Sequence, residues 1–148
     1  MTTVKQILHV KGHAVYTIPP DHTVYEALEM LVERNVGALM VVDAAQNFLG
    51  VFSERDYARR VVLKGRNSRD THIRDIMTEH PISVTEADSL EHCMQLMTDK
   101  HIRHLPVVDG QQRLVGLVSI GDLVKQIMQE QQHTIENLEK YISGAYHG

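Results

Sequence analysis

Short apolar runs alternate with one stretch of helical periodicity in the first third of the chain. Residues 36–43 are too apolar to alternate, so we expect a buried strand there, followed after a turn by a second strand at residues 48–52. Ahead of them, Thr23 and Glu26 have the spacing of a capping box and precede apolar residues three and four positions apart. A helix is therefore predicted there, with a short strand at residues 15–18 before it and a second helix after Ser53.

The same order of elements returns 66 residues further along the chain, because residues 15–57 align on residues 81–123 without a gap. Eight aligned pairs are identical: Leu39/Leu105, Val41/Val107, Val42/Val108, Asp43/Asp109, Gln46/Gln112, Gly50/Gly116, Ser53/Ser119 and Asp56/Asp122. The repeat predicts an α/β (α+β) fold of two β-α-β-β-α units, each with helices on one face of a small sheet. Two such units related by an approximate twofold axis would enclose a cleft, where small molecules usually bind.

The segments outside the repeat are less regular. Residues 4–8 are either one turn of helix or a strand, and residues 72–77 are expected to form a short helix. The last helix continues past Met128 with a narrow apolar stripe, which either binds a partner or folds back on its own domain. The predicted division is an N-terminal extension (1–14), a first domain (15–63), a linker (64–72), a second domain (73–130) and a C-terminal helix (131–148).

Composition narrows the functional classes. The net charge is −4 and no stretch is dense in Lys and Arg, which argues against binding nucleic acid. The single cysteine, Cys93, fits a reducing compartment, and the chain contains neither a signal-like start nor a run of about 18 apolar residues. We expect a cytoplasmic protein without a membrane segment.

Catalytic patterns are absent from the sequence. The 10 histidines do not form the metal-binding spacings of helices, and there is no Walker loop. Cys93 lies among apolar residues at helical spacing, where it would be an inert core thiol. We therefore expect a protein that is not an enzyme and needs no metal.

The sequence Gly-Val-Phe-Ser-Glu-Arg-Asp at residues 50–56 returns as Gly-Leu-Val-Ser-Ile-Gly-Asp at residues 116–122. This duplication, with His-Ile-Arg-His-Leu-Pro-Val-Val-Asp at residues 101–109, resembles a tandem pair of cystathionine-β-synthase (CBS) domains, a Bateman module, over roughly residues 10–130. The resemblance implies a stand-alone, non-catalytic signal-transduction module that binds adenine nucleotides between its repeats. AMP is the first expectation for the ligand, with ADP, ATP, NAD(H) or S-adenosylmethionine as alternatives. The resemblance also implies a disk-like homodimer that reports energy or redox state to an effector protein.

In this family the Asp of the motif accepts hydrogen bonds from the ribose hydroxyls. The resemblance therefore implies that Asp56 and Asp122 bind the ribose. Ser53 and Ser119, three residues earlier at a helix start, would offer free amides to a polar ligand. The alternative is that each Ser-Asp pair simply caps its helix.

The resemblance also implies that Arg103 and His104 contact the phosphate, since relatives carry basic residues at these positions. Their counterparts Gly37 and Ala38 carry no charge, so the two clefts should differ. Arg55 reaches either a phosphate or a surface partner, whereas Arg59 and Arg60 are expected on a solvated helix face. The predicted base contacts and apolar walls, several of which are equally good core positions, are Thr17, Ile18, Val36, Gly37, Ala38, Ser83, Val84, Ile102, Leu105 and Pro106.

Two other functions remain open at this point. One is a nucleotide-free adaptor that binds a protein through the disk face or the last helix. The other is an enzyme that hydrolyses a nucleotide, which the lack of a catalytic constellation disfavours.

Overall fold

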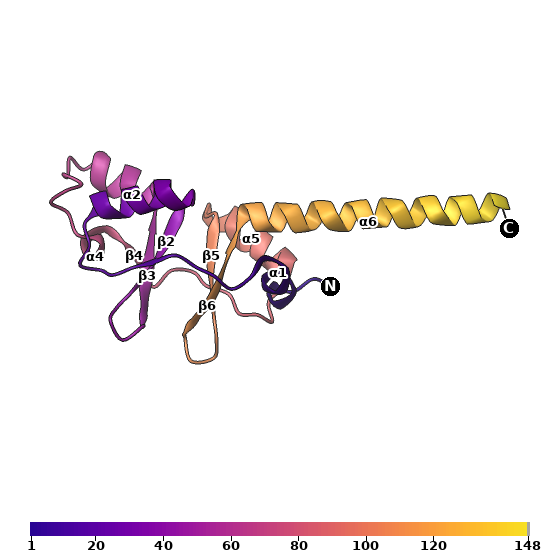
Figure 1. The fold of residues 1–148 in the computed structure, drawn as a ribbon, viewed down its shortest axis with the longest axis horizontal. Coiled ribbons are helices and arrows are strands. Elements are labelled where there is room, and N and C mark those ends of the chain that lie inside the picture. The colour runs from indigo at the N-terminus through magenta and orange to yellow at the C-terminus, as the bar shows by residue number, and fades with distance from the viewer. Residues whose placement is uncertain (148) are drawn as a thin grey trace.

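The computed structural model describes residues 1–147 of the 148-residue chain. Two small sheets lie side by side with helices packed against them, and the last helix projects away from this body (Figure 1). The elements in order are α1 (Val4–Lys11), β1 (Thr17–Ile18), α2 (Val24–Arg34), β2 (Ala38–Val42), β3 (Phe48–Ser53), α3 (Glu54–Asp56), the π-helical segment η1 (Tyr57–Val62), α4 (Ile73–Ile76), β4 (Thr78–Glu79), α5 (Leu90–Lys100), β5 (His104–Val108), β6 (Leu114–Ser119) and α6 (Ile120–His147).

The two sheets confirm the predicted repeat and show where its copies differ. The first sheet has the order β1-β2-β3-β4, with β1 parallel to β2 and the other neighbours antiparallel. The second contains only the β5-β6 hairpin, and the strand expected at residues 82–84 is reduced to one parallel bridge between Val84 and Val107. Both hairpins have a register shift at the same place in the repeat, between Val41 and Val42 and between Val107 and Val108.

The predicted capping box of α2 is confirmed, because Thr23 and Glu26 satisfy each other's backbone amides. The same device starts α1, where Thr3 and Gln6 form a capping box and so decide in favour of a helix at residues 4–8. Beyond Asp56 the expected α-helix is instead π-helical, a wider turn that is often found near functional sites.

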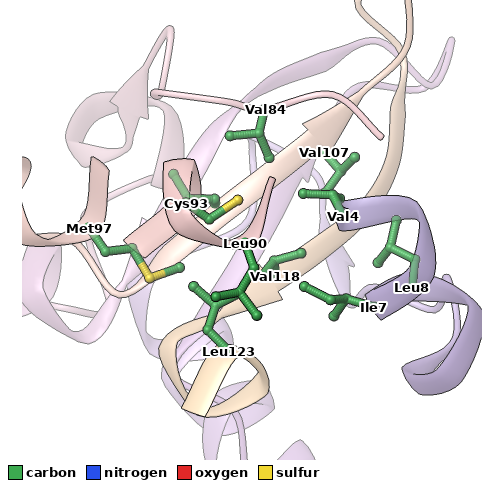
Figure 2. Packing of buried hydrophobic residues seen from close by; sticks show 11 residues of the cluster. Val4, Ile7, Leu8, Val84, Leu90, Cys93, Met97, Val107, Val118 and Leu123 are labelled. Atoms are coloured by element: carbon green, nitrogen blue, oxygen red, sulfur yellow. The ribbon is translucent and has the colours of Figure 1, made fainter. Parts of the chain in front are cut away.

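The helix that precedes each repeat packs into the other repeat. Val4, Ile7 and Leu8 of α1 are buried in the core of the second half, among residues of α5, β5 and β6 (Figure 2). Ile73 and Ile76 of α4 are buried in the core of the first half. The backbone contacts match, since the Val4 amide donates to Asp88 at 2.8 Å and the Ile73 amide donates to His22 at 2.9 Å. The core of each half is therefore completed by the helix that precedes the other half.

A third apolar cluster joins the halves. Ala38, Met40 and Val51 from the first sheet are buried there, and Leu114 and Leu117 from the second sheet pack against them. The two sheets thus meet through residues of β2, β3 and β6. The cleft between the halves lies beside this contact.

Gly50 and Gly116 occupy equivalent positions in the two repeats but have different neighbours. The same substitution is therefore expected to lower the stability of the fold by different amounts. A Cβ on Gly50 would lie 2.4 Å from the Thr78 carbonyl oxygen, which is backbone, whereas a Cβ on Gly116 would lie 2.9 Å from the Leu8 methyl groups, which can move. We expect Gly50→Ala to lower the free energy of unfolding by about 3 kcal/mol and Gly116→Ala by about 1 kcal/mol in urea denaturation. Gly110→Ala is the control, because nothing lies within 4 Å of its added Cβ. Equal losses at Gly50 and Gly116 would contradict this reading of the two contacts.

The last helix does not fold back. α6 is 28 residues long and runs straight out from β6, away from both sheets (Figure 1). Its side chains are exposed at every position from 131 to 142. Of the two alternatives left open by the sequence, folding back on its own domain is not observed, and binding of a partner stays a prediction.

Candidate functional site between the two halves

A cleft of about 990 Å³ lies between the two halves. The first half contributes residues of β3, α3 and η1, and the second half contributes the end of α5 and the start of β5. The lining residues are Gly37, Val51, Ser53, Glu54, Arg55, Asp56, Arg59, Arg60, Thr78, His80, Pro81, Ile82, Lys100, His101, Ile102, Arg103 and His104.

Asp56 is the buried carboxylate of this cleft, with 7% of its surface exposed. Its Oδ2 accepts from the Ser53 amide at 2.9 Å and from the Ser53 hydroxyl at 3.0 Å, and its Oδ1 accepts from the Thr78 hydroxyl at 2.9 Å. The Ser-Asp pair therefore caps α3, which is the alternative to ligand binding that the sequence left open. Because a carboxylate has about four lone-pair sites, one further donor can still bind, and a ligand hydroxyl could replace Thr78.

Positive charge surrounds this carboxylate. The lining includes five Lys or Arg residues and only two carboxylates, Glu54 and Asp56, although the whole chain has a net charge of −4. The cationic residues are Arg55, Arg59, Arg60, Lys100 and Arg103. Such a concentration of charge in a cleft favours an anionic ligand.

Two of these arginines also hold the cleft together. The Arg55 guanidinium donates to the His101 carbonyl and so links the first half to the second. Arg60 donates to the Met77 carbonyl at 2.8 Å, and its Nε lies 4.0 Å from the Asp56 carboxylate. Arg59 and Arg60 are exposed, as expected of a solvated helix face, and both also line the cleft.

His104 crosses from one half to the other. Its imidazole packs on Gly37, where an added Cβ would lie 3.3 Å from Cε1. Burial lowers the pKa of His104 below its ordinary value, and the positive charge of Lys11 lowers it further. The ring is therefore neutral at pH 7 and can accept a hydrogen bond from a ligand.

The equivalent carboxylate of the second half, Asp122, is not among the residues that line this cleft. It caps α6 with Ser119, whose amide donates to Oδ2 at 2.8 Å. The same oxygen lies 2.5 Å from Lys11 Nζ, and Lys11 also donates to the Leu117 carbonyl at 2.7 Å. Partial burial alone would raise the pKa of Asp122, but the hydrogen bonds from Lys11 and Ser119 outweigh it and lower the pKa. The two copies of the motif thus have different partners, Thr78 for one and a lysine for the other.

The Lys11–Asp122 pair makes a testable contribution to acid stability. A carboxylate whose pKa is lowered by folding stabilises the fold above its unfolded pKa of about 3.9, and this stabilisation is lost as the pH falls through the folded value. We expect Lys11→Met to raise the pKa of Asp122 in a carboxyl NMR titration and to flatten the loss of stability below about pH 4. Lys5→Met is the control, since Lys5 is exposed on the same helix. An unchanged Asp122 titration in Lys11→Met would show that the pair does not form in solution.

The structure brings seven of the sequence-predicted site residues into the cleft. These are Gly37, Ser53, Arg55, Asp56, Ile102, Arg103 and His104. The other predicted residues lie elsewhere: Ile18, Val84 and Leu105 are buried in the cores, Ala38 is buried between the halves, Pro106 is buried in β5, Thr17 is in β1, and Val36, Ser83, Ser119 and Asp122 are outside the cleft lining.

Several lining residues were missed by the sequence analysis. Thr78 and His80 lie after α4 and ahead of the aligned repeat, so the repeat contains no signal for them. Pro81 and Ile82 are the first two residues of the second copy, and neither is identical to its aligned counterpart, Val15 or Tyr16. Arg59 could have been found, because it lies four residues after Arg55 and such residues share a helix face.

The family model of the CBS domain matches residues 4–63 and 73–129. The chain belongs to the CBS domain family. The first matched range begins at Val4 and so includes α1, which the repeat alignment had left outside. This match confirms the resemblance inferred from the duplicated motif, and the chain contains a tandem CBS pair.

Known proteins are similar to this chain over most of its length. The chain is 39% identical over 153 residues to the CBS domain-containing protein CBSX3, mitochondrial, of Arabidopsis thaliana, covering 98% of this chain and 74% of that protein. It is 45% identical to a protein with CBS domains from Burkholderia ambifaria, whose structure superposes with a TM-score of 0.82 over 88% of this chain and 96% of the other. A third similar structure is CBSX2 in complex with AMP, with 27% identity and a TM-score of 0.72 over 88% of this chain and 99% of that one.

Neither a metal centre nor a membrane span is found in the part of the chain that the structure describes. Among the side chains that the structure describes, no three of His, Cys, Asp or Glu are grouped so as to hold a metal ion. No helix in that part of the chain is both long and apolar enough to cross a bilayer.

Proposed function

We propose that this CBS pair is a non-catalytic regulatory module that binds an adenosine nucleotide in the cleft beside Asp56. The observation that carries the proposal is the cleft itself, where one buried carboxylate is surrounded by an excess of cationic side chains. A nucleotide has the complementary pattern, a diol that donates to a carboxylate next to phosphates that need positive charge. The AMP bound by the similar CBSX2 supports this choice of ligand class.

Each part of the ligand has a proposed set of partners. Asp56 and Ser53 would bind the ribose hydroxyls, and the base would lie against the apolar part of the lining, Ile82 and Ile102. The phosphates would contact the cationic residues, with Arg55 and Arg103 reaching them from opposite halves. AMP is our first choice, and ADP, ATP, NAD(H) and S-adenosylmethionine remain alternatives.

Binding across the halves provides the mechanism of signalling. A ligand held by residues of both halves favours the relative orientation in which all its contacts form, and its differential affinity shifts the population towards that orientation. The Arg55 contact with the His101 carbonyl crosses the same boundary, so a phosphate that draws Arg55 away would loosen it. The effector protein, the disk-like homodimer and the cytoplasmic location stay predictions.

Only one nucleotide per chain is expected. The carboxylate of the second motif is held by Lys11, and a ribose there would have to compete with that ion pair. The cation nearest the Asp56 carboxylate, Arg60, lies at 4.0 Å, compared with 2.5 Å between Lys11 and Asp122, so the Asp56 cleft should fill first.

Isothermal titration calorimetry with AMP, ADP, ATP, NADH and S-adenosylmethionine tests the proposal directly. We expect one of these ligands to bind with a stoichiometry near one and to stabilise the fold by about 2.7 kcal/mol at a hundredfold excess over its Kd. If no ligand at millimolar concentration gives a heat of binding or raises the melting temperature, nucleotide binding is refuted and the adaptor is favoured. Chromatography of the same mixtures tests the enzyme alternative, because sustained product formation would refute a non-catalytic role.

A further inference from the structure

The repeat defines where a second cleft, the counterpart of the Asp56 cleft, would lie. Residues that line the Asp56 cleft have counterparts at an offset of 66 positions in the sequence. Four of these pairs are Val51/Leu117, Asp56/Asp122, Ile82/Tyr16 and Lys100/Arg34. The contacts of the second members of these pairs therefore show what occupies the second cleft.

The side chain of Lys11 occupies the carboxylate end of this second cleft. Its Nζ donates to the Leu117 carbonyl at 2.7 Å and lies 2.5 Å from Asp122 Oδ2. One ammonium group thus contacts the counterparts of two residues that line the first cleft. The side chains of Lys11 and Asp122 are 28% and 23% exposed, so the pair is mostly removed from water. The ammonium takes the place on Asp122 that the donating hydroxyls of a ribose would take.

The first motif shows which neutral group Lys11 replaces. Thr78 donates its hydroxyl to Asp56 Oδ1 at 2.9 Å, and the offset of 66 residues places Gly12, the residue after Lys11, at the position of Thr78. Each motif carboxylate therefore accepts from the segment that precedes the other repeat. The donor is a neutral hydroxyl at Asp56 and a cation at Asp122, where the attraction of opposite charges adds to the hydrogen bond. A ligand hydroxyl should displace Thr78 more readily than Lys11.

The wall that would hold a base is also covered in the second cleft. Arg34 Cζ lies 5.2 Å from the centre of the Tyr16 ring, within the range of a cation–π contact. The guanidinium covers the ring face on which an adenine would stack. Both side chains are exposed, so Arg34 can move aside without disturbing a core. The more buried Lys11 contact therefore decides whether the second cleft opens.

We propose that Lys11 is a built-in occupant of the second cleft, an autoinhibitory contact that keeps adenosine ligands off Asp122. The inference rests on the proposed function, because it treats the motif aspartates as ribose sites. It does not require that a ligand binds at Asp56. It gives α1 a second role beside the completion of a core.

Folding holds the Lys11 ammonium beside Asp122. Ile7 and Leu8 of α1 are buried in the second half, and Lys11 is the last residue of this helix. Gly12 then turns the chain away at φ +99°, a conformation that favours glycine, and its amide donates to the Leu8 carbonyl at 2.7 Å. A cation tethered in this way has a high effective concentration at its partner. A free ligand must compete with that concentration to reach Asp122.

Calorimetric titration of the full-length chain with AMP, ADP, ATP, NADH and S-adenosylmethionine counts the open clefts. We expect Lys11→Met to raise the stoichiometry of the ligand that binds from near one to near two. Loss of a hydrogen bond between charged groups should make the second motif about ten- to a hundredfold tighter than in the wild type. Lys11→Gln should give the same result, because it also removes the charge.

Two further variants identify the new site. Lys5→Met removes an exposed lysine from the same helix, so its stoichiometry should stay near one. Adding Asp122→Asn to Lys11→Met should remove the second equivalent of ligand. Thermal melts of each variant show that it is folded.

The outcomes separate this proposal from the assignment of the Asp56 cleft. A wild-type stoichiometry of two, or a stoichiometry of one in both Lys11 variants, would overturn the autoinhibitory contact and leave the Asp56 site standing. A wild type that binds nothing, with one equivalent in Lys11→Met that Asp122→Asn removes, would refute the Asp56 site and support the contact. If none of these proteins binds any of the ligands, both proposals are overturned.

Discussion

Replacing Asp56 with asparagine is expected to weaken binding of the adenosine nucleotide by about ten- to a hundredfold. Hydrogen bonds to a charged group contribute about 1.5–3 kcal/mol, and the variant loses the charge while keeping the size of the side chain. Asparagine also replaces one acceptor oxygen with an amide donor, which would face the Ser53 amide or the Thr78 hydroxyl. Calorimetric titration with the ligand that binds the wild type gives the change in Kd.

Two matched variants separate the role of Asp56 from general effects of charge. Asp122→Asn removes the same charge from the second motif, but Asp122 is held by Lys11 and lies outside the cleft lining, so a change of less than threefold is expected. Asp21→Asn removes the charge from an exposed loop and should leave the affinity unchanged. Thermal melts of all three variants show whether each is folded. Equal losses for Asp56→Asn and Asp122→Asn would place the ligand on both motifs and contradict the assignment to one cleft.

Leu8→Ala is expected to lower the free energy of unfolding by about 3–4 kcal/mol, although the residue lies ahead of the repeat in the sequence. Leu8 is 0% exposed and packs in the core of the second half (Figure 2). Its methyl groups lie against Gly116. Truncation of a fully buried leucine removes favourable transfer of its methyl groups and leaves a cavity that the neighbours only partly fill. Urea denaturation measures the loss from the shift of the midpoint at constant slope.

The control for this substitution lies on the same helix. Val10 is 71% exposed on α1, so Val10→Ala should change stability by less than about 0.5 kcal/mol. If Leu8→Ala costs no more than Val10→Ala, α1 is an appendage in solution and the second half is stable without it. A large loss instead supports a single cooperative unit, in which each half is completed by the helix that precedes the other.

Much of the local structure was predictable because its causes are local. Thr23 and Glu26 are three residues apart, and the capping box they predict forms as expected. The strands at residues 38–42 and 48–53 lie where the apolar runs predict them, to within a few residues. Residues 82–84, the counterpart of β1 in the second repeat, do not form a strand. Only Val84 pairs with β5, through a single bridge to Val107.

The candidate site was predictable only in part. The motif itself places Ser53, Arg55 and Asp56 in the cleft, since all three lie on one short segment whose local structure the sequence indicates. Residues such as Thr78 and His80 enter the same cleft from the segment after α4, and their approach depends on how that segment crosses to the first half. Asp122 shows the converse, because the equivalent aspartate of the second copy has a different partner, Lys11, which α1 places against it.

By itself, the sequence determined the two-repeat α/β architecture, the start of α2 and the apolar stripe of the last helix. These features depend on residue spacing within one element or on the identity of two aligned copies, both of which are visible along the chain. Only the tertiary structure decided that α1 and α4 exchange halves, that cations gather around one carboxylate while a lysine holds the other, and that α6 points outward. These outcomes depend on which distant segments pack together, and packing is governed by the shape and burial of surfaces that form only when the chain has folded.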